Sequence, residues 1–586
     1  MGRLTQIALM GVLVLMVASL ASAQQVPEPM VRLGNFIEVG NDVFMHIMAA
    51  IDTRYRTTEN YDFDSKVRDR VSSRFPGDTV AMNASGDLLT AQLRLGVEAK
   101  YQKNLTLYLL FQHEQIMDGN TIDDRSNSTT PGGTDVFGRA AVSENPGFHT
   151  ERYWIDYKFA GTPLRMRVGA DLWTQDQAGL VGDDDPRFAL FGDFGNIDVM
   201  AAAVYQMESQ RLGLENDNDF IYYTFSGGYN LKPHRFQLDV TYFRDRFLGA
   251  DTQSPVPSAR GVGSNAGPVG FQGQKTDSVL IMGSWSGRVG PVRALVQGNI
   301  LTGTAHGGTN VAGLPAGAIP NRKYDIFAGG VVAYAEADLG IVRPFVGFIY
   351  GSGDGDPTDN KLHGFMTLPT NEITLITGTP FFEHLDPSNA FALRDYSYPA
   401  RAQGVRTADT LGGSGIATNR FAVGAAALGN AVQGNHTTGN PFNDRIGNTS
   451  HLGIATTYSN PGTFVIPVGV RTFPLKGHEI TGWFVHRRVE KSALMDRAFI
   501  QCPAAVCDPG FHGHIRKALY NEVGGFYQWT LNPYFDIRLS GNIGIPDGGY
   551  RDLGRLANCN PSGPLRQGCD GNDIALKGEA RFRARF

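Results

Sequence analysis

A set of arginines recurs at every second position within segments whose intervening positions are apolar. In residues 89–101, for example, Arg94 lies between Leu93 and Leu95. Side chains of an extended strand point to opposite faces in turn, so this spacing separates the arginines from the apolar residues. A guanidinium is always charged and binds carboxylates through two parallel hydrogen bonds, so the chemistry on offer is anion binding. The alternation assigns these residues to the polar face as the lining of a solute path: Arg94, Arg152, Asp156, Arg165, Arg167, Arg235, Arg293, Arg343, Arg538, Arg581 and Arg583.

Acidic residues share that face: Glu98, Asp171, Asp239, Asp536 and Glu579 follow the same alternation. Two interpretations of the arginines therefore stay open. They can form a field that favours anions in a pore, because a low-dielectric wall focuses charge on passing ions. Alternatively, they can pair with the acids and brace a wide barrel.

The elements that position these residues are predicted as antiparallel hairpins. The apolar and polar alternation of residues 89–101 is longer than an ordinary strand and matches the roughly nine to eleven residues of a membrane-spanning strand. It recurs in pairs of segments joined by tight turns, at residues 89–117, 152–173, 187–206, 220–246, 278–302, 327–351, 464–490 and 520–545. An opening strand near residues 45–57 and a closing strand near 573–586 give about 18 strands. We expect an all-β fold, a single antiparallel transmembrane β-barrel.

Longer polar segments separate the hairpins, for example residues 118–147, 247–275 and 355–448. Short turns that alternate with long polar loops are typical of outer-membrane barrels, with the turns periplasmic and the loops extracellular. The region 355–460 is predicted as a long loop that is either folded into the barrel or extracellular. Part of it, residues 420–458, is alternatively a further hairpin.

Both ends of the chain carry export signals. Arg3, an apolar stretch over residues 7–20 and the small residues Ala21-Ser22-Ala23 predict a signal peptide of residues 1–23, which leaves a mature barrel of residues 24–586. The final segment alternates up to the terminal Phe586, which looks like the signal that the barrel assembly machinery recognises. We therefore expect the outer membrane of a Gram-negative-type bacterium, with its lipid around the barrel.

Two stretches resemble the alginate export family of outer-membrane proteins. They are ERYWIDYKFAGTPLRMRVGADLW (151–173) and IYGSGDGDPTDNKLHGF (349–365). The resemblance implies an 18-stranded barrel, an arginine-rich lumen that selects a polyuronate, and loops that act as gates. The positions that match the family pattern are Arg152, Asp156, Arg165 and Arg167.

These observations predict a passive or loop-gated, porin-like channel for anionic organic solutes or an acidic polysaccharide. The alternative is a scaffold barrel that houses or anchors a partner protein such as an electron carrier. No nucleophile has a distinguishing sequence context, so we expect neither enzyme activity nor a cofactor. The formal net charge is −5, so the sequence lacks the excess of basic residues that is typical of nucleic-acid-binding proteins.

Four cysteines fall late in the chain as two close pairs. Cys502 is expected to form a local disulfide with Cys507, and Cys559 is expected to form another with Cys569, because secretion places the chain in an oxidising compartment. Zinc is the alternative for the pair of Cys502 and Cys507.

Acidic loops suggest a further site. Asp354, Asp356 and Asp359 share a glycine-rich loop at a spacing that suits calcium, and a solvated loop is the alternative. Residues 183–185 form a second acidic patch.

Overall fold

The structure is a computed structural model that describes most of the strands and turns of the chain. The described residues are 37–38, 42–59, 70–75, 78–82, 86–116, 147–171, 173–178, 181, 186–207, 220–245, 275–309, 319–355, 360–365, 462–492, 516–549, 551–552 and 574–585.

Several predictions fall on residues outside these ranges. They concern the signal peptide, the acidic residues 183–185, most of the region 355–460, and the residues Asp356, Asp359, Cys502, Cys507, Cys559, Cys569 and Phe586. The structure therefore tests neither the disulfide of Cys502 with Cys507 nor the disulfide of Cys559 with Cys569. All of these stay predictions.

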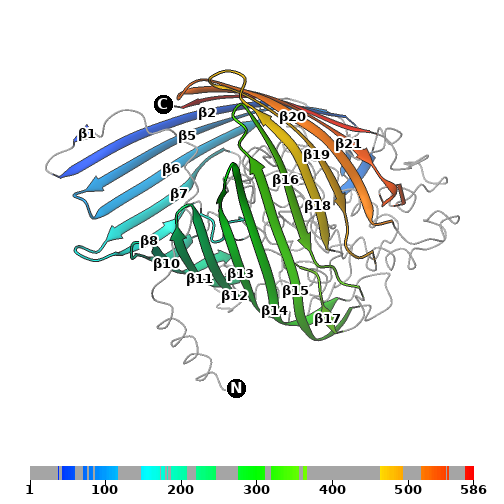
Figure 1. The fold of residues 1–586 in the computed structure, drawn as a ribbon, viewed down its shortest axis with the longest axis horizontal. Helices are drawn as coiled ribbons and strands as arrows, with labels where there is room; N and C mark the ends of the chain where they lie inside the picture. Colours follow the sequence, from blue (N-terminus) through cyan, green and yellow to red (C-terminus); the bar gives the residue numbers. More distant parts are fainter. Residues whose placement is uncertain are drawn as a thin grey trace.

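The described chain forms one sheet of 20 strands, of which β1 (Ile37–Glu38) and β17 (Lys361–Leu362) have two residues each. The other 18 strands build an antiparallel barrel, as the sequence predicts (Figure 1). They are β2 (Val43–Glu59), β5 (Gly86–Tyr101), β6 (Leu105–Ile116), β7 (Gly147–Lys158), β8 (Leu164–Ala170), β9 (Pro186–Asp193), β10 (Ile197–Met207), β11 (Phe220–Leu231), β12 (His234–Asp245), β13 (Lys275–Val289), β14 (Val292–Thr309), β15 (Ile319–Ala337), β16 (Val342–Gly351), β18 (Thr463–Thr472), β19 (His478–Arg488), β20 (Ala518–Asn532), β21 (Phe535–Pro546) and β22 (Ala575–Arg585). A separate hairpin joins β3 (Arg70–Phe75) and β4 (Asp78–Met82).

The first long strand closes the barrel because it pairs on both sides. Ile51 of β2 is in register with Leu93 of β5 and with Ala584 of β22. Every backbone donor and acceptor along these strands can therefore be satisfied within a closed sheet, which is the condition for crossing a lipid bilayer with strands. Figure 1 shows β22 ending beside β2, with the C-terminus at that seam.

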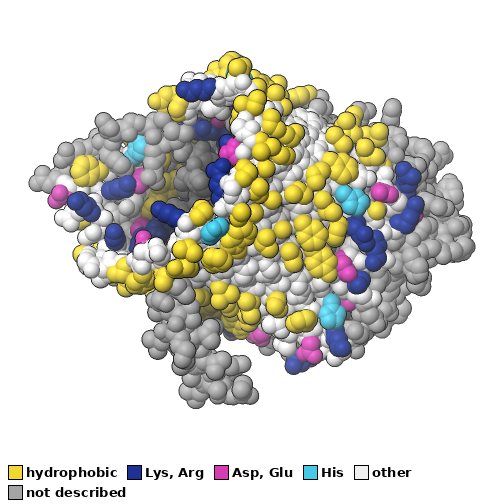
Figure 2. Space-filling model, in the orientation of Figure 1, with side chains coloured by type: hydrophobic (Ala, Val, Ile, Leu, Met, Phe, Trp, Pro, Cys, Tyr) yellow, Lys and Arg dark blue, Asp and Glu magenta, His cyan; other side chains and the backbone are white. Residues whose placement is uncertain are grey.

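The two faces of the barrel wall differ as the alternation predicts. On β14, Val296 and Ile300 are exposed on the outer face, whereas Gln297 and Asn299 are buried on the inner face. Figure 2 shows the resulting apolar band across the outside of the barrel. An apolar exterior with a polar interior is the surface pattern of membrane-spanning barrels. Among the described residues, no helix is long and apolar enough to cross a membrane.

The predicted hairpin over residues 152–173 is wrong at its end, because its second strand, β8, stops at Ala170. Gly169 has a φ of +128°, and a Cβ there would lie 2.1 Å from the carbonyl oxygen of Tyr153. The backbone thus leaves the regular strand conformation at a position that only glycine fills easily. Beyond Ala170 the chain turns into the barrel interior, and the described part of this excursion, residues 171, 173–178 and 181, is here named the infolded segment.

Candidate functional site

Four arginines gather on the inner face of β7, β8 and β9. The register pairs Asp156 with Arg167 and Gly169 with Arg187, so inward-facing residues of the three strands lie side by side. Arg152, Arg167 and Arg187 are buried, whereas Tyr153, Val168 and Phe188, which follow them in the chain, are exposed on the outer face. This arginine cluster, Arg152, Arg165, Arg167 and Arg187, forms because the alternation of three adjacent strands is in phase.

Two carboxylates hold the cluster together. Asp156 accepts from Arg165 at 2.8 Å and from Arg167 at 2.9 Å. Asp171, the first residue of the infolded segment, accepts from Arg167 and pairs with Arg187 at 2.6 Å. In these contacts three guanidiniums share two carboxylates. Charge-assisted pairs of this kind fix the guanidinium geometry.

Exposure separates the members of the cluster. The side chain of Arg165 is 33% exposed, whereas those of Arg167 and Arg187 are 4% and 2% exposed. A solute inside the barrel can therefore reach the guanidinium of Arg165 directly. The two buried arginines act on it only through their charge.

Aromatic rings stack against the guanidiniums. The Cζ atom of Arg167 lies 4.1 Å from the centroid of Trp154, and that of Arg187 lies 4.4 Å from Trp173. Trp173 stacks in turn on Tyr222 of β11, with 6.3 Å between the centroids. These cation–π contacts restrict the rotamers of long side chains and keep the cluster in one geometry.

The infolded segment is bound to the wall at β12–β14 through glutamines. The Nε2 atom of Gln237 on β12 donates to the carbonyl of Gln175 at 2.7 Å. The Nε2 atom of Gln177 donates to Ser284 of β13 at 2.8 Å, and Gln297 of β14 donates to Asp176 at 2.7 Å. The segment therefore crosses the interior from β8 to β14 and narrows the space beside the arginine cluster.

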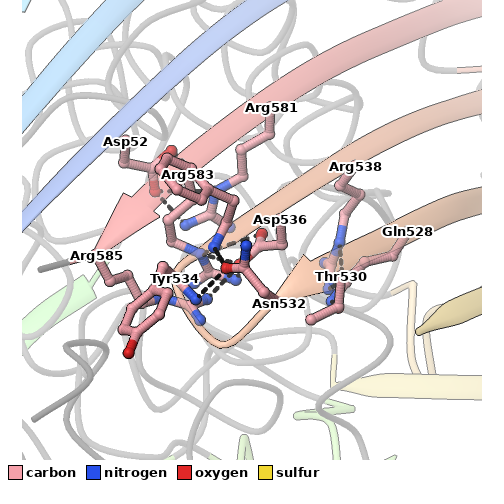
Figure 3. Close-up of polar contacts among 11 residues, drawn as sticks. Asp52, Gln528, Thr530, Asn532, Tyr534, Asp536, Arg538, Arg581, Arg583 and Arg585 are labelled. Atoms are coloured by element: carbon pink, nitrogen blue, oxygen red, sulfur yellow. Dashed lines mark hydrogen bonds and ion pairs between the residues drawn. The ribbon is translucent and has the colours of Figure 1, made fainter. Parts of the chain in front are cut away.

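The other predicted arginines do not gather into one site. At the closing seam, Arg581 binds Asp52 of β2 at 2.9 Å, and Arg583 binds Asp536 of β21 at 3.1 Å (Figure 3). Arg585 binds the same carboxylate of Asp536 at 2.5 Å. These ion pairs join the first strand to the last two, so they brace the seam.

Arg235 shows how such a pair crosses a strand. Its Nη1 atom binds Asp198 at 2.9 Å, although β11 lies between their strands. Gly228 of β11 lies under the pair, and a Cβ there would be 2.5 Å from both partners. Glycine at this position makes room for the ion pair.

The remaining predicted arginines also have partners. Arg293 lies 3.0 Å from Glu336, which also accepts from Arg471 at 3.3 Å. Arg343 lies 3.3 Å from Asp338. Two more bind neutral amides: Arg94 donates to Gln112 at 2.5 Å, and Arg538 donates to Gln528 at 2.9 Å (Figure 3). Most of the predicted arginines thus have an acidic partner in the wall, and on β7–β9 three guanidiniums share two carboxylates.

Arg187, Arg471 and the acids Asp198 and Glu336 were not predicted from the sequence. Arg187 follows the same alternation as the predicted residues, since Phe188 is exposed on the outer face. It could have been found by extending the alternation to the whole of β9. Nothing local indicated the infolded segment.

The described residues contain no group of three or more His, Cys, Asp or Glu that could hold a metal ion. Asp354 is buried at 1% exposure. The other two predicted calcium ligands lie outside the described ranges, so the calcium site is untested. The same holds for zinc at Cys502 and Cys507.

Fold and site together define a class: a closed antiparallel barrel with a lipid-compatible exterior and a charged, partly obstructed interior. Solved structures with a similar overall fold include OccAB2 of Acinetobacter baumannii, with 10% identity and a TM-score of 0.44 over 94% of this chain and 99% of that one. OprD of Pseudomonas aeruginosa is similar at 7% identity and a TM-score of 0.41, over 96% and 98% of the two chains. The outer membrane protein OpdK of Pseudomonas aeruginosa is similar at 10% identity and a TM-score of 0.40, over 92% and 98%. No protein-family model and no curated protein matches this chain.

Proposed function

We propose that this chain is an outer-membrane channel that admits anionic organic solutes. The observation that supports the proposal is the arginine cluster, where guanidiniums outnumber the carboxylates that they share beside the infolded segment. An anion that passes this point meets the partly exposed Arg165, and the buried charges of Arg167 and Arg187 lie behind it. Cationic side chains along a hydrated passage with low-dielectric walls favour anions over cations.

The solute follows its own gradient, and no covalent step is required. The guanidinium of Arg165 presents a planar fork of N–H donors. A solute carboxylate can bind this fork in place of water. Asp156 remains bound to Arg167 while this happens, at 2.9 Å, so the wall keeps its structure. The infolded segment sets the size of what passes.

An acidic polysaccharide is the finer form of the proposal. Three more partly exposed guanidiniums are distributed around the wall: Arg235, Arg293 and Arg343 have side chains that are 21%, 31% and 34% exposed. A long polyanion could contact several of them in sequence, whereas a small anion would contact one. The resemblance of residues 151–173 to the alginate export family also favours a polyuronate.

The test is single-channel recording of the mature chain, residues 24–586, in planar bilayers. We expect a conductance whose reversal potential in a salt gradient shows anion preference, and we expect uronate oligomers to reduce the current. Cation preference would refute the anion channel. A folded barrel that conducts nothing, even after deletion of residues 366–448, would favour the alternative of a scaffold for a partner protein.

A further inference from the structure

A row of aromatic and cationic side chains crosses the outer face of the barrel where β16, β18 and β19 meet the long connections. The register aligns Tyr350 with Phe464, and Phe464 with Arg488. All three lie on the outer face, because the alternation places them with the exposed Val346, Val468 and Phe484. Tyr350 and Arg488 lie within the last two residues of β16 and β19, and Phe464 is the second residue of β18. All three therefore lie at the edge of the apolar band.

Within this row, an aromatic ring packs against both a second ring and a guanidinium. Phe464 packs edge-on against Phe348, with 5.3 Å between centroids. The guanidinium of Arg488 lies over Phe464, with its Cζ atom 5.4 Å from the centroid. Aromatic girdles of this kind mark the boundary between acyl chains and head groups. Arg488 therefore lies at head-group level.

Cations continue along the same edge on β15 and β17. Lys361 of β17 is in register with Asp325 of β15, and both are exposed on the outer face. Lys323 lies 4.0 Å from Asp325, and its side chain is 59% exposed. These charges lie beyond Phe327, which is 62% exposed on the outer apolar face.

The row ends beside β19 and β20. Lys491 pairs with Glu490 at 2.8 Å, and Arg516 pairs with Asp552 at 2.8 Å, while both cations stay largely exposed. The hydrogen bond to Glu490 raises the pKa of Lys491 above its ordinary value, and the hydrogen bond to Asp552 does the same for the pKa of Arg516. Both side chains are thus charged at neutral pH.

The loop-side rim comprises Lys323, Lys361, Arg488, Lys491, Arg516 and Lys517 with the acids Asp325, Glu490, Asp547 and Asp552. Its six cations exceed its four acids. Figure 2 shows dark-blue Lys and Arg side chains along the right-hand side of the visible face, beyond the yellow apolar band. A ligand that covers both regions needs anionic groups next to long apolar chains.

We propose that the loop-side rim binds the phosphate groups of the glycolipid of the outer leaflet. The acyl chains would cover the apolar band below Phe464, and the phosphates would meet Arg488 and the lysines above it. Cations at a membrane surface attract anionic head groups, and arginine and lysine are the usual partners of phosphate. This inference depends on the proposed membrane orientation but not on what the channel transports.

The experiment measures binding of bis-phosphorylated lipid A to the purified mature chain in detergent micelles, beside lipid A from which both phosphates have been removed. The test variant combines Lys361→Gln with Arg488→Gln. Each charge contributes about fivefold in affinity, so we expect the double variant to bind roughly 25-fold more weakly. The matched control combines Lys103→Gln with Lys476→Gln, two exposed lysines of the short turns, and should bind as the parent does.

Heat-dependent migration of the barrel on gels establishes that each variant is folded. If the test variant does not fold, Lys323→Gln with Lys491→Gln replaces it, with the same expectation. Equal binding of the dephosphorylated lipid overturns the proposal, as does an equal loss in the control. Full competition by millimolar inorganic phosphate would also overturn it, because the site would then accept a free anion. Conductance recorded on the same variants distinguishes a failure of this inference from a failure of the channel.

Discussion

Replacement of Arg165 by glutamine separates charge selection from folding. Arg165 shares Asp156 with Arg167, at 2.8 and 2.9 Å, so the carboxylate keeps one cationic partner when Arg165 is lost. The side chain is one third exposed, and exposed pairs stabilise a fold by about 0–1 kcal/mol. The guanidinium also lies 4.1 Å from the ring of Phe191, a contact worth about 0.5–1 kcal/mol at exposed sites. We therefore expect Arg165→Gln to assemble as a barrel.

The effect on ions follows from the charge of the cluster. A solute carboxylate about 4 Å from a guanidinium gains about 1 kcal/mol in water and about 4 kcal/mol at an effective dielectric constant of 20. The lumen beside Arg165 is hydrated enough to expose this side chain, so the lower value applies. Loss of about 1 kcal/mol corresponds to about a fivefold fall in the permeability ratio of anion to cation.

The assay is the reversal potential of single channels in a tenfold salt gradient, recorded for the parent, Arg165→Gln and Arg165→Lys. The lysine variant keeps the charge and loses the planar fork. It should retain most of the ion selectivity but bind uronate oligomers more weakly. An unchanged reversal potential in the glutamine variant would refute the assignment, and so would equal behaviour of the two variants.

Three more predictions test the wall, the exterior and the constriction. Gly228→Ala places a Cβ about 2.5 Å from Arg235 and Asp198, so the pair should separate and the free energy of unfolding should fall by about 1–3 kcal/mol in urea titrations from lipid vesicles. Ile300→Arg introduces a charge on the lipid face and should lower the same quantity by about 2–4 kcal/mol; a neutral effect would show that this face does not contact lipid. Gln297→Leu removes both amide contacts to the infolded segment, at 2.7 and 3.1 Å, so single-channel conductance should rise, and an unchanged value would place the constriction elsewhere.

The strands could be predicted because their signal is local. Alternation with a period of two separates the faces of a strand without knowledge of its neighbours, and a tight turn fixes the register of a hairpin. The predicted hairpin of residues 220–246 agrees with β11 and β12, which cover residues 220–231 and 234–245. The same rule failed after Ala170, where Asp171 and Trp173 continue the alternation although the chain has left the sheet. Alternation alone does not distinguish a strand from a segment that turns inward.

The partners of the arginines could not be predicted for a different reason. Alternation assigns a side chain to a face, but its contacts depend on strand tilt and stagger across the barrel. Arg235 binds Asp198 across an intervening strand because Gly228 leaves space for the two side chains. The two partners lie 37 residues apart in the sequence. The glutamine contacts of the infolded segment span 62 to 121 residues. Such contacts are set by the closed barrel and not by local sequence.

The arginine cluster and the infolded segment are coupled in this barrel through one residue. Asp171 is the carboxylate that binds Arg167 and Arg187, and it is also the point where the infolded segment leaves β8. Two residues further on, Trp173 stacks on Arg187, so any displacement of the segment also moves the ring away from the guanidinium. A change in the width of the passage would therefore change the charge that faces it. Conductance and anion preference should vary together among variants of the segment, whereas variants of the closing seam, where Arg583 is paired with Asp536, should alter stability alone.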